Sequence, residues 1–214
     1  MSQSYTFAFV DLAGFTALTD HHGDQAAADQ IRRFGQIARD CVTGTATVVN
    51  VVGDAVLVAA DEVGDGVDST LALLEACIAE PQFPLARGGL HTGTAVRSGS
   101  DFFGSGVNVA ARVAARAGGG ELMLTGTPAK VAYDRGRTVH ELGLVELRNV
   151  ASRHELFRID LARGAVSLDP VCRMTVQQPD AAGSLTHGGH TYWFCSLECA
   201  GAFAIDPVRH ANNR

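Results

Sequence analysis

The sequence lacks any apolar run that approaches the roughly 18 residues needed to cross a bilayer. It also lacks a basic N-terminal region followed by an apolar core and a small-residue cleavage site, the pattern of a secretory signal. Cationic charge is scarce, with 17 Lys and Arg against 23 Asp and Glu and a formal net charge of −6. Neither nucleic acid nor a membrane is therefore expected as a partner, because each would favour a basic face. We predict a cytoplasmic protein.

Cysteine is sparse as well, with five residues in a chain of 214. A disulfide framework is not expected in a reducing compartment. Cys41 and Cys77 are expected to be small buried apolar residues, whereas Cys172, Cys195 and Cys199 cluster in a way that indicates metal binding. The remaining composition, 46% hydrophobic and 19% charged, is typical of a packed globular protein and excludes wholesale disorder.

Hydrophobic periodicity predicts an α+β fold. The expected strands are 5–12, 46–52, 55–60, 85–96, 121–125, 138–146 and 155–159, the expected helices are 24–41, 63–80 and 107–116, and 97–106 is expected to be a loop. The order strand, helix, hairpin, helix, strand is that of a ferredoxin-like βαββαβ unit. We therefore predict a catalytic-type domain over 1–160, a linker over 161–168 and a module over 169–214. That module is too small to hold much core without a staple such as a metal.

Two carboxylates stand at the ends of apolar strands: Asp11 ends the first, and Asp54 lies at the tip of the hairpin. A carboxylate in such a place is costly without a partner, and neighbouring carboxylates can be satisfied through cations such as Mg²⁺. Two bound ions would suit phosphoryl transfer. The turn between strand and helix has N–H groups that could receive a triphosphate, and it consists of Ala13, Gly14, Phe15 and Thr16. On spacing alone the alternative stays open that Asp11 caps the helix and Asp54 serves the turn.

Three motifs in order resemble those of class III adenylate and guanylate cyclases. F-V-D-L-A-G-F-T at 9–16 is similar to F-x-D-[IL]-x-G-F-T, N-V-V-G-D-A-V-L at 50–57 is similar to K-x-x-G-D-x-x-[LM], and D-F-F-G-S-G-V-N-V-A-A-R at 101–112 is similar to D-x-x-G-x-x-V-N-x-A-x-R. The resemblance implies a class III cyclase homology domain with two Mg²⁺ or Mn²⁺ ions per active site. Asp11 and Asp54 would hold both ions, and the Leu12 carbonyl would complete one of the two metal sites.

The resemblance also implies roles for residues further along the chain. Asn108 would orient the ribose, and Arg112 would stabilise charge on the α-phosphate in the transition state. These two residues are four apart and share one helix face. Arg148 matches the place of a lysine that contacts the triphosphate, and an arginine keeps that charge. In the family the aspartates and the Asn/Arg pair come from different protomers, so the resemblance implies a head-to-tail homodimer.

The positions that read the base depart from the adenylate cyclase pattern. There a lysine at the place of Asn50 donates to adenine N1, and an aspartate at the place of Asp101 accepts from the N6 amino group. Asp101 is present, and the Asn50 amide can still donate, whereas guanine O6 would face a carboxylate. We predict an adenylate cyclase that converts ATP to 3′,5′-cyclic AMP and diphosphate. The alternative is a weak or inactive cyclase-like domain that acts as a nucleotide- or metal-sensing dimeric regulator.

The C-terminal segment resembles a YHS domain. D-P-V-C-R-M-T-V at 169–176 is similar to D-P-V-C-x-M-x-V, and Y-W-F-C-S-L-E-C at 192–199 is similar to Y-x-F-C-S-x-x-C. The resemblance implies a metal-handling module in which Cys172, Cys195 and Cys199 are the ligands of copper or zinc. The fusion of two such units motivates the hypothesis that metal or redox state at the module tunes cyclase output.

The identity of that metal is left open by the residues. Three thiolates suit Cu(I), whereas Zn²⁺ would take a fourth ligand from His187, His190 or water. Ser196 is placed to cap a helix whose first turn contains Cys199. The alternative is that the three cysteines are buried apolar residues. His91, in a core strand, is expected to pack rather than to bind a metal.

Overall fold

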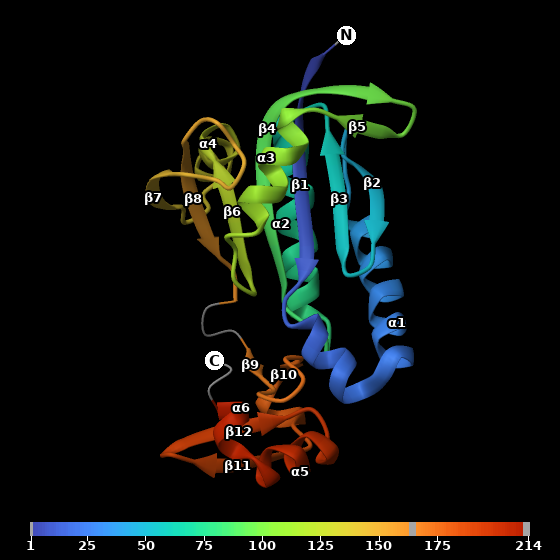
Figure 1. The fold of residues 1–214 in the computed structure, drawn as a ribbon, viewed down its shortest axis with the longest axis vertical. Coiled ribbons are helices and arrows are strands. Elements are labelled where there is room, and N and C mark those ends of the chain that lie inside the picture. The colour runs from blue at the N-terminus through green and yellow to red at the C-terminus, as the bar shows by residue number, and fades with distance from the viewer. Residues whose placement is uncertain (1, 163–165, 212–214) are drawn as a thin grey trace.

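The computed structural model describes residues 2–162 and 166–211, and Figure 1 shows an α/β unit above a small C-terminal segment. One eight-stranded sheet has the order β2-β3-β1-β4-β6-β8-β7, with β5 paired to β4. Its strands are β1 (Gln3–Leu12), β2 (Thr47–Val52), β3 (Ala55–Ala60), β4 (Ala86–Ser98), β5 (Asp101–Phe103), β6 (Glu121–Thr125), β7 (His140–Val145) and β8 (His154–Asp160). Strands β4 and β6 run parallel, and the other neighbours run antiparallel. The first four strands confirm the predicted ferredoxin-like arrangement.

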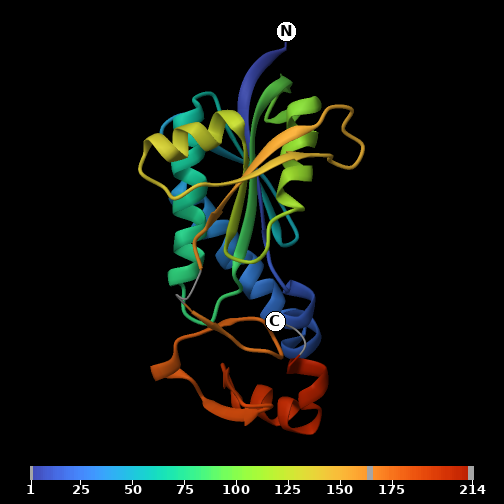
Figure 2. The same cartoon turned by 90° about the vertical axis from the view of Figure 1, so that its left-hand side faces the viewer.

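Helices cover both faces of the sheet, as Figure 2 shows nearly edge-on. The helices are α1 (Phe15–Cys41), α2 (Val63–Ala79) and α4 (Gly126–Asp134) on one face and α3 (Ser105–Ala114) on the other. Because side chains alternate along a strand, Val10 and Leu12 pack in the cluster beneath α1 and α2, whereas Phe7 packs in the cluster beneath α3. The same alternation places Asp11 on the face of the sheet that α3 covers.

Three elements differ from the sequence-based bounds. Helix α1 begins at Phe15 rather than at residue 24, because the chain is helical on both sides of a kink at Gly23, whose φ is 80°. Residues 97–106 are not a loop, because β4 continues to Ser98 and turns back into β5, where the Phe102 ring packs on two aromatic rings of β1. Helix α4 was not predicted. None of the described helices has the length and apolar character that a bilayer crossing demands.

The C-terminal segment packs against the lower end of the sheet unit (Figure 1). It contains β9 (Ser167–Leu168), β10 (Thr175–Val176), the 3₁₀ turn η1 (Gln178–Asp180), β11 (Gly183–His187), β12 (His190–Phe194), α5 (Leu197–Ile205) and α6 (Pro207–Ala211). Its apolar cluster, with Phe194 and Phe203 at the centre, also contains Leu18 and Ala27 of α1. The sheet unit and the C-terminal segment therefore share a hydrophobic core where they meet.

Backbone hydrogen bonding adds to that contact. The Thr175 N–H donates to the Phe83 carbonyl at 3.0 Å, and Pro84 forms an isolated β-bridge with Met174. The predicted division into 1–160, 161–168 and 169–214 stays a prediction. Residues 163–165 of the expected linker and 212–214 of the expected module lie outside the described residues.

Candidate functional site

The two aspartates of the first and second motifs lie at the same end of the neighbouring strands β1 and β3, which we call the carboxylate edge. Strands β1 and β3 are antiparallel neighbours, and Asp11 lies opposite Ala55, the residue after Asp54. The Leu12 N–H donates to the Asp54 carbonyl at 3.1 Å, which fixes the hairpin tip beside the end of β1. The Leu12 side chain is buried in the core, so only its backbone is available to this edge.

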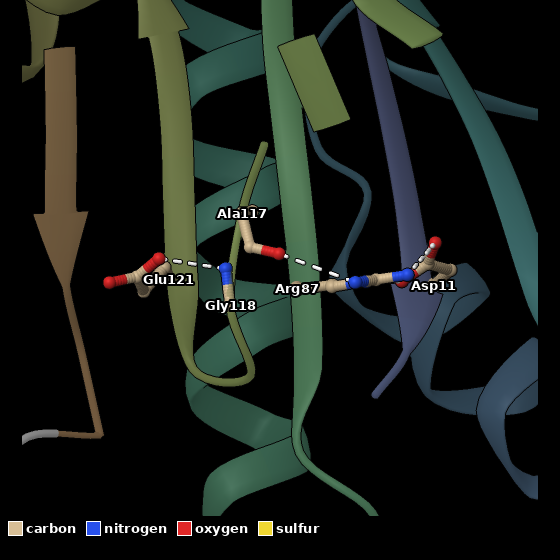
Figure 3. A network of polar contacts seen from close by, with 5 residues as sticks. All are labelled: Asp11, Arg87, Ala117, Gly118 and Glu121. Carbon is tan, nitrogen blue, oxygen red and sulfur yellow. Dashed lines mark hydrogen bonds and ion pairs between the residues drawn. The ribbon is translucent and has the colours of Figure 1, made fainter. Parts of the chain in front are cut away.

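A guanidinium lies at the place where cations were predicted (Figure 3). Arg87 on β4 is the cross-strand partner of Asp11. Its Nε donates to Asp11 Oδ1 at 2.5 Å and its Nη2 to Oδ2 at 3.3 Å, while Nη1 reaches the Ala117 carbonyl at 3.4 Å. The hydrogen bond to Asp11, with a smaller contribution from the charge of Asp54, raises the pKa of Arg87. The Asp11 carboxylate is thus paired with a guanidinium of its own chain.

Arg87 was not among the predicted site residues. The available signal was one arginine at the start of an otherwise apolar strand, in A-R-G-G-L. Its partner cannot be read from the sequence, because Asp11 and Arg87 lie 76 residues apart and meet only through the register of β1 and β4.

The predicted phosphate-binding turn is partly in use. The Ala13 N–H donates to the Leu85 carbonyl at 2.7 Å, which corrects its prediction as a free donor for substrate. Gly14, with φ of 77°, begins α1 without a side-chain cap, so the N–H groups of the first helical turn lack an intrahelical partner. The available donors are those of Gly14, Phe15 and Thr16.

A side chain of the C-terminal segment packs against this turn. A Cβ added at Gly14 would lie 2.7 Å from Arg173 Cβ, so the glycine is required by close approach as well as by its positive φ. Arg173 itself is partly buried, and that burial lowers its pKa. A cation of the C-terminal segment therefore borders the candidate triphosphate turn.

The other predicted site residues lie on the surface. They are Asn50 on β2, Asp101 at the start of β5, Asn108 and Arg112 on α3, and Arg148 between β7 and β8, and all five are exposed. Within the described ranges, no hydrogen bond or ion pair joins any of them to Asp11 or Asp54. The opposite face of α3 lies so close to β4 that a Cβ at Gly89 would come within 2.0 Å of the Ala114 nitrogen. The Asn108 and Arg112 side chains are thus presented outward.

A second cluster brings together three sulfurs and one imidazole. The ligand atoms of His22, Cys172, Cys195 and Cys199 all lie within 4.8 Å of one another. Cys195 Sγ lies 3.5 Å from Cys172 Sγ and 3.6 Å from Cys199 Sγ. His22 Nε2 lies 3.9 Å from Cys195 Sγ and 3.8 Å from Cys199 Sγ.

The nitrogen in this cluster does not come from the expected residues. His187 and His190, on β11 and β12, are not part of the group, and His22 of α1 takes the place that was predicted for them. The signal was the His21-His22 pair directly before Gly23, but nothing local connects it to a cysteine 173 residues later.

The cysteine-bearing segments are held by a buried carboxylate and a helix cap. Asp169, fully buried, accepts the Val171 N–H and the Cys195 N–H at 2.8 Å each, and the burial raises its pKa. Ser196 Oγ accepts the Cys199 N–H at 3.1 Å, which confirms the predicted N-cap of α5. The sulfur positions are therefore fixed by the protein backbone.

The thiols also act on one another. Contacts from the other two thiols lower the pKa of Cys199, and the same contacts raise the pKa of Cys172. The cluster thus favours anionic sulfur at Cys199. Cys77, outside the cluster, is fully buried and its burial raises its pKa, whereas Cys41 is only partly buried.

His91 packs, as predicted. Its Nδ1 lies 2.9 Å from Thr125 Oγ1, and its ring makes an edge contact with His154. Burial, assisted by the neighbouring His154, lowers the pKa of His91 to about 4. The ring is therefore neutral at physiological pH.

The curated proteins that are similar in sequence to this chain include bacterial adenylate cyclases. A pH-sensitive adenylate cyclase of Mycobacterium tuberculosis is 30% identical over 187 residues, which cover 86% of this chain and 46% of the relative. An adenylate cyclase of Streptomyces griseus is 35% identical over 129 residues, 60% of this chain and 32% of the relative. The chain thus spans less than half the length of these relatives. No protein-family model matches the sequence.

A different relative shares a short stretch. A copper-transporting P-type ATPase of Rhizobium leguminosarum is 46% identical over 46 residues, 22% of this chain and 6% of the relative. No family model supports the predicted YHS assignment, which stays a prediction.

Solved structures identify the fold of the sheet unit. The adenylyl cyclase CyaB from P. aeruginosa superposes with a TM-score of 0.62 at 18% identity, covering 74% of this chain and 94% of that one. The guanylate cyclase domain of RhGC from Catenaria anguillulae, in complex with GTP, gives a TM-score of 0.62 at 17% identity, covering 75% of this chain and 98% of that one. The chain therefore has relatives among adenylate cyclases and contains the fold of nucleotidyl cyclase catalytic domains.

Proposed function

We propose that the chain is an adenylate cyclase that converts ATP to 3′,5′-cyclic AMP and diphosphate at sites shared by two copies. The observation that carries the proposal is the position of Asp11 and Asp54 at the same end of two paired strands, beside a helix that begins without a side-chain cap. The named relatives of the chain support the same activity.

The oxygen atoms at this edge are suitable ligands for hard divalent cations. Two carboxylates and one backbone carbonyl are the oxygen ligands that Mg²⁺ and Mn²⁺ prefer, so Asp11, Leu12 and Asp54 would hold them. The bound ions would activate the ribose 3′ hydroxyl and neutralise the triphosphate. Arg87 orients the Asp11 carboxylate through two hydrogen bonds, and its guanidinium would supply a fixed positive charge for the triphosphate.

The remaining groups bind and orient the nucleotide. The N–H groups of Gly14, Phe15 and Thr16 would bind triphosphate oxygens, helped by the α1 dipole. Arg148 would add a charged contact to the same oxygens. From a second copy, Asn108 would orient the ribose and Arg112 would stabilise the charge on the α-phosphate. The outward presentation of α3 supports this division between copies.

Mixing two inactive variants tests the shared site. Asp54→Ala and Arg112→Ala, each purified as the full chain, should be inactive with Mg²⁺ or Mn²⁺ and ATP. In a mixed dimer one site loses both groups and the other keeps both, so an equimolar mixture should recover about one quarter of the wild-type cyclic AMP formation. A mixture that stays as inactive as its components would contradict the shared site.

The choice of base is a separate part of the proposal. Asp101 would accept from the adenine amino group and Asn50 would donate to N1, both from exposed positions. Because solved cyclases of this fold include a guanylate cyclase bound to GTP, the assay should offer ATP and GTP in parallel. Faster turnover of GTP would overturn the predicted base preference.

The second candidate is a cyclase-like regulator with little or no turnover. The observation in its favour is the absence of a lysine at position 50. If the wild-type chain forms no cyclic nucleotide and Asn50→Lys does not restore it, the regulator takes the place of the enzyme.

Tuning of the cyclase by the C-terminal segment is supported by the packing of Arg173 against Gly14. Activity should therefore change when zinc, copper or a thiol oxidant is added to the full chain. A truncation at residue 160 is a poor test, because it uncovers Leu18 and Ala27, which the C-terminal cluster buries. Equal activity of the full chain with and without these additions would argue against tuning.

A further inference from the structure

We propose that His22, Cys172, Cys195 and Cys199 form a tetrahedral Zn²⁺ site that joins helix α1 of the sheet unit to the C-terminal segment. The site takes three ligands from one part of the chain and the fourth from the other. It is distinct from the Asp11 and Asp54 edge, and its existence does not depend on cyclase activity.

The spacing of the four ligand atoms matches a tetrahedron around zinc. With Zn–S bonds of about 2.3 Å, the edges of a regular tetrahedron are about 3.8 Å long. Four of the six edges are 3.5 and 3.6 Å between sulfurs and 3.8 and 3.9 Å between sulfur and nitrogen, and all six are within 4.8 Å. Sulfurs at these separations are not joined by a disulfide, whose S–S length is about 2.05 Å, and all three cysteines are free.

The ligand set selects among soft cations. Cys₃His is a recognised set for structural zinc, whereas three thiolates alone would suit Cu⁺. The imidazole of His22 supplies the fourth ligand that the tetrahedral ion needs. The three cysteines are buried and Phe194, Phe203 and Leu18 pack around them, so the site is closed, as structural zinc sites are.

Ordinary burial of apolar thiols explains this arrangement less well. Cys77 shows that alternative, because it lies fully buried in the main core and apart from the cluster. In the cluster, by contrast, a ring nitrogen and three sulfurs converge from two distant parts of the chain. Asp169 and Ser196 hold the cysteine backbones by hydrogen bonds and so orient the ligands, as residues behind metal ligands do.

The proposed ion would also explain how so small a C-terminal segment stays folded. A segment of about 45 residues cannot bury enough apolar surface to be stable alone without a staple. A ligand on α1 closes a loop of 173 residues between His22 and Cys195, so metal binding would stabilise the docking of the segment as well as its fold.

Zinc titration of the full chain tests the site. We expect one Zn²⁺ per chain, with an X-ray absorption spectrum that requires three sulfur neighbours and one nitrogen neighbour. His22→Ala should weaken Zn²⁺ binding, measured against a chromophoric chelator, by about 100-fold or more, since even the loss of a residue that only orients a ligand costs 10–100-fold. His190→Ala is the matched control, because it removes an exposed imidazole of the same segment and leaves all four ligands, and its affinity should equal that of the wild type.

One further variant and one further measurement keep the test decisive. His22→Cys should retain tight binding with four sulfur neighbours, which separates loss of a ligand from loss of folding in His22→Ala. Trp193, the single tryptophan, reports unfolding of the segment by its fluorescence, and added Zn²⁺ should raise its unfolding midpoint in the wild type and in His22→Cys. Unchanged affinity in His22→Ala, loss of binding in His190→Ala, or a three-sulfur Cu⁺ site that excludes Zn²⁺ would each overturn the proposal.

Discussion

The carboxylate edge and the Cys₃His cluster differ in how they are closed. At the edge, Asp11 and Asp54 are partly exposed, and one guanidinium balances the charge of Asp11. In the cluster, three sulfurs are buried and the fourth group comes from the same chain. Charged groups can stay at an open edge because water solvates them, whereas buried ligands must find partners within the fold. The carboxylate edge therefore fits its proposed role of receiving substrate and a second copy, whereas the cluster has its four groups within one chain.

The largest effect should come from removing a carboxylate at the open edge. Asp54→Ala should lower cyclic AMP formation by about 10³-fold or more, because metal stabilisation of the reacting charges is worth several kcal/mol. Asp134→Ala, which removes an exposed carboxylate on α4, is the control and should keep full activity. Near-wild-type turnover by Asp54→Ala would show that the carboxylate edge takes no part in catalysis.

The Zn²⁺ affinity of the cluster should depend on a cysteine within it and not on one outside it. Cys199→Ser should lower Zn²⁺ affinity by about 100-fold or more, whereas Cys41→Ser, outside the cluster, should leave the affinity unchanged. The same chelator competition measures both variants. Equal affinities would show that the cluster does not hold the metal.

Activity with ATP should rise when the proposed adenine contact at Asn50 is strengthened. Asn50→Lys should raise kcat/KM for ATP about tenfold, because a charged donor makes a hydrogen bond to N1 stronger by about 1.4 kcal/mol. Thr47→Lys places the same charge elsewhere on β2 and is the control. Equal gains in the two variants would assign the effect to general attraction of ATP.

A smaller effect is expected from a titrating group outside both regions. The folded state lowers the pKa of His91 to about 4 from a usual value near 6.5, so the unfolded chain binds more protons between these values. The contribution of His91 to the unfolding free energy should be constant well above pH 6.5 and fall by about 1–2 kcal/mol towards pH 4, after allowance for partial exposure. Metal-free chain should be used, because acid also releases thiolate-bound metal. An identical decline in His91→Gln would assign the acid sensitivity to another group.

Local patterns predicted the parts of the molecule that local forces determine. The alternation of β1 and the turn at Gly53-Asp54 were sufficient to place both aspartates, because strand period and turn chemistry are short-range. The kink at Gly23 escaped prediction, although glycine at a positive φ is its cause.

What the sequence could not supply were partners set by long-range register. Arg87 meets Asp11 only when β1 and β4 are aligned, and His22 meets Cys195 only when the C-terminal segment docks. Proximity in sequence was misleading for His187 and His190, which lie near the cysteines along the chain yet outside the cluster. The Ala13 N–H was likewise assigned to substrate because its partner, the Leu85 carbonyl, comes from a distant strand.

Helix α1 has a consequence for transplanting the C-terminal segment to another protein. Before its kink at Gly23 the helix carries Leu18 and His22, which complete the apolar cluster and the ligand set of that segment. A chimera that received only residues 169–211 would therefore lack one ligand and expose apolar surface. A functional graft needs a host helix with the same two residues one turn apart, so the exchangeable unit is discontinuous along the chain.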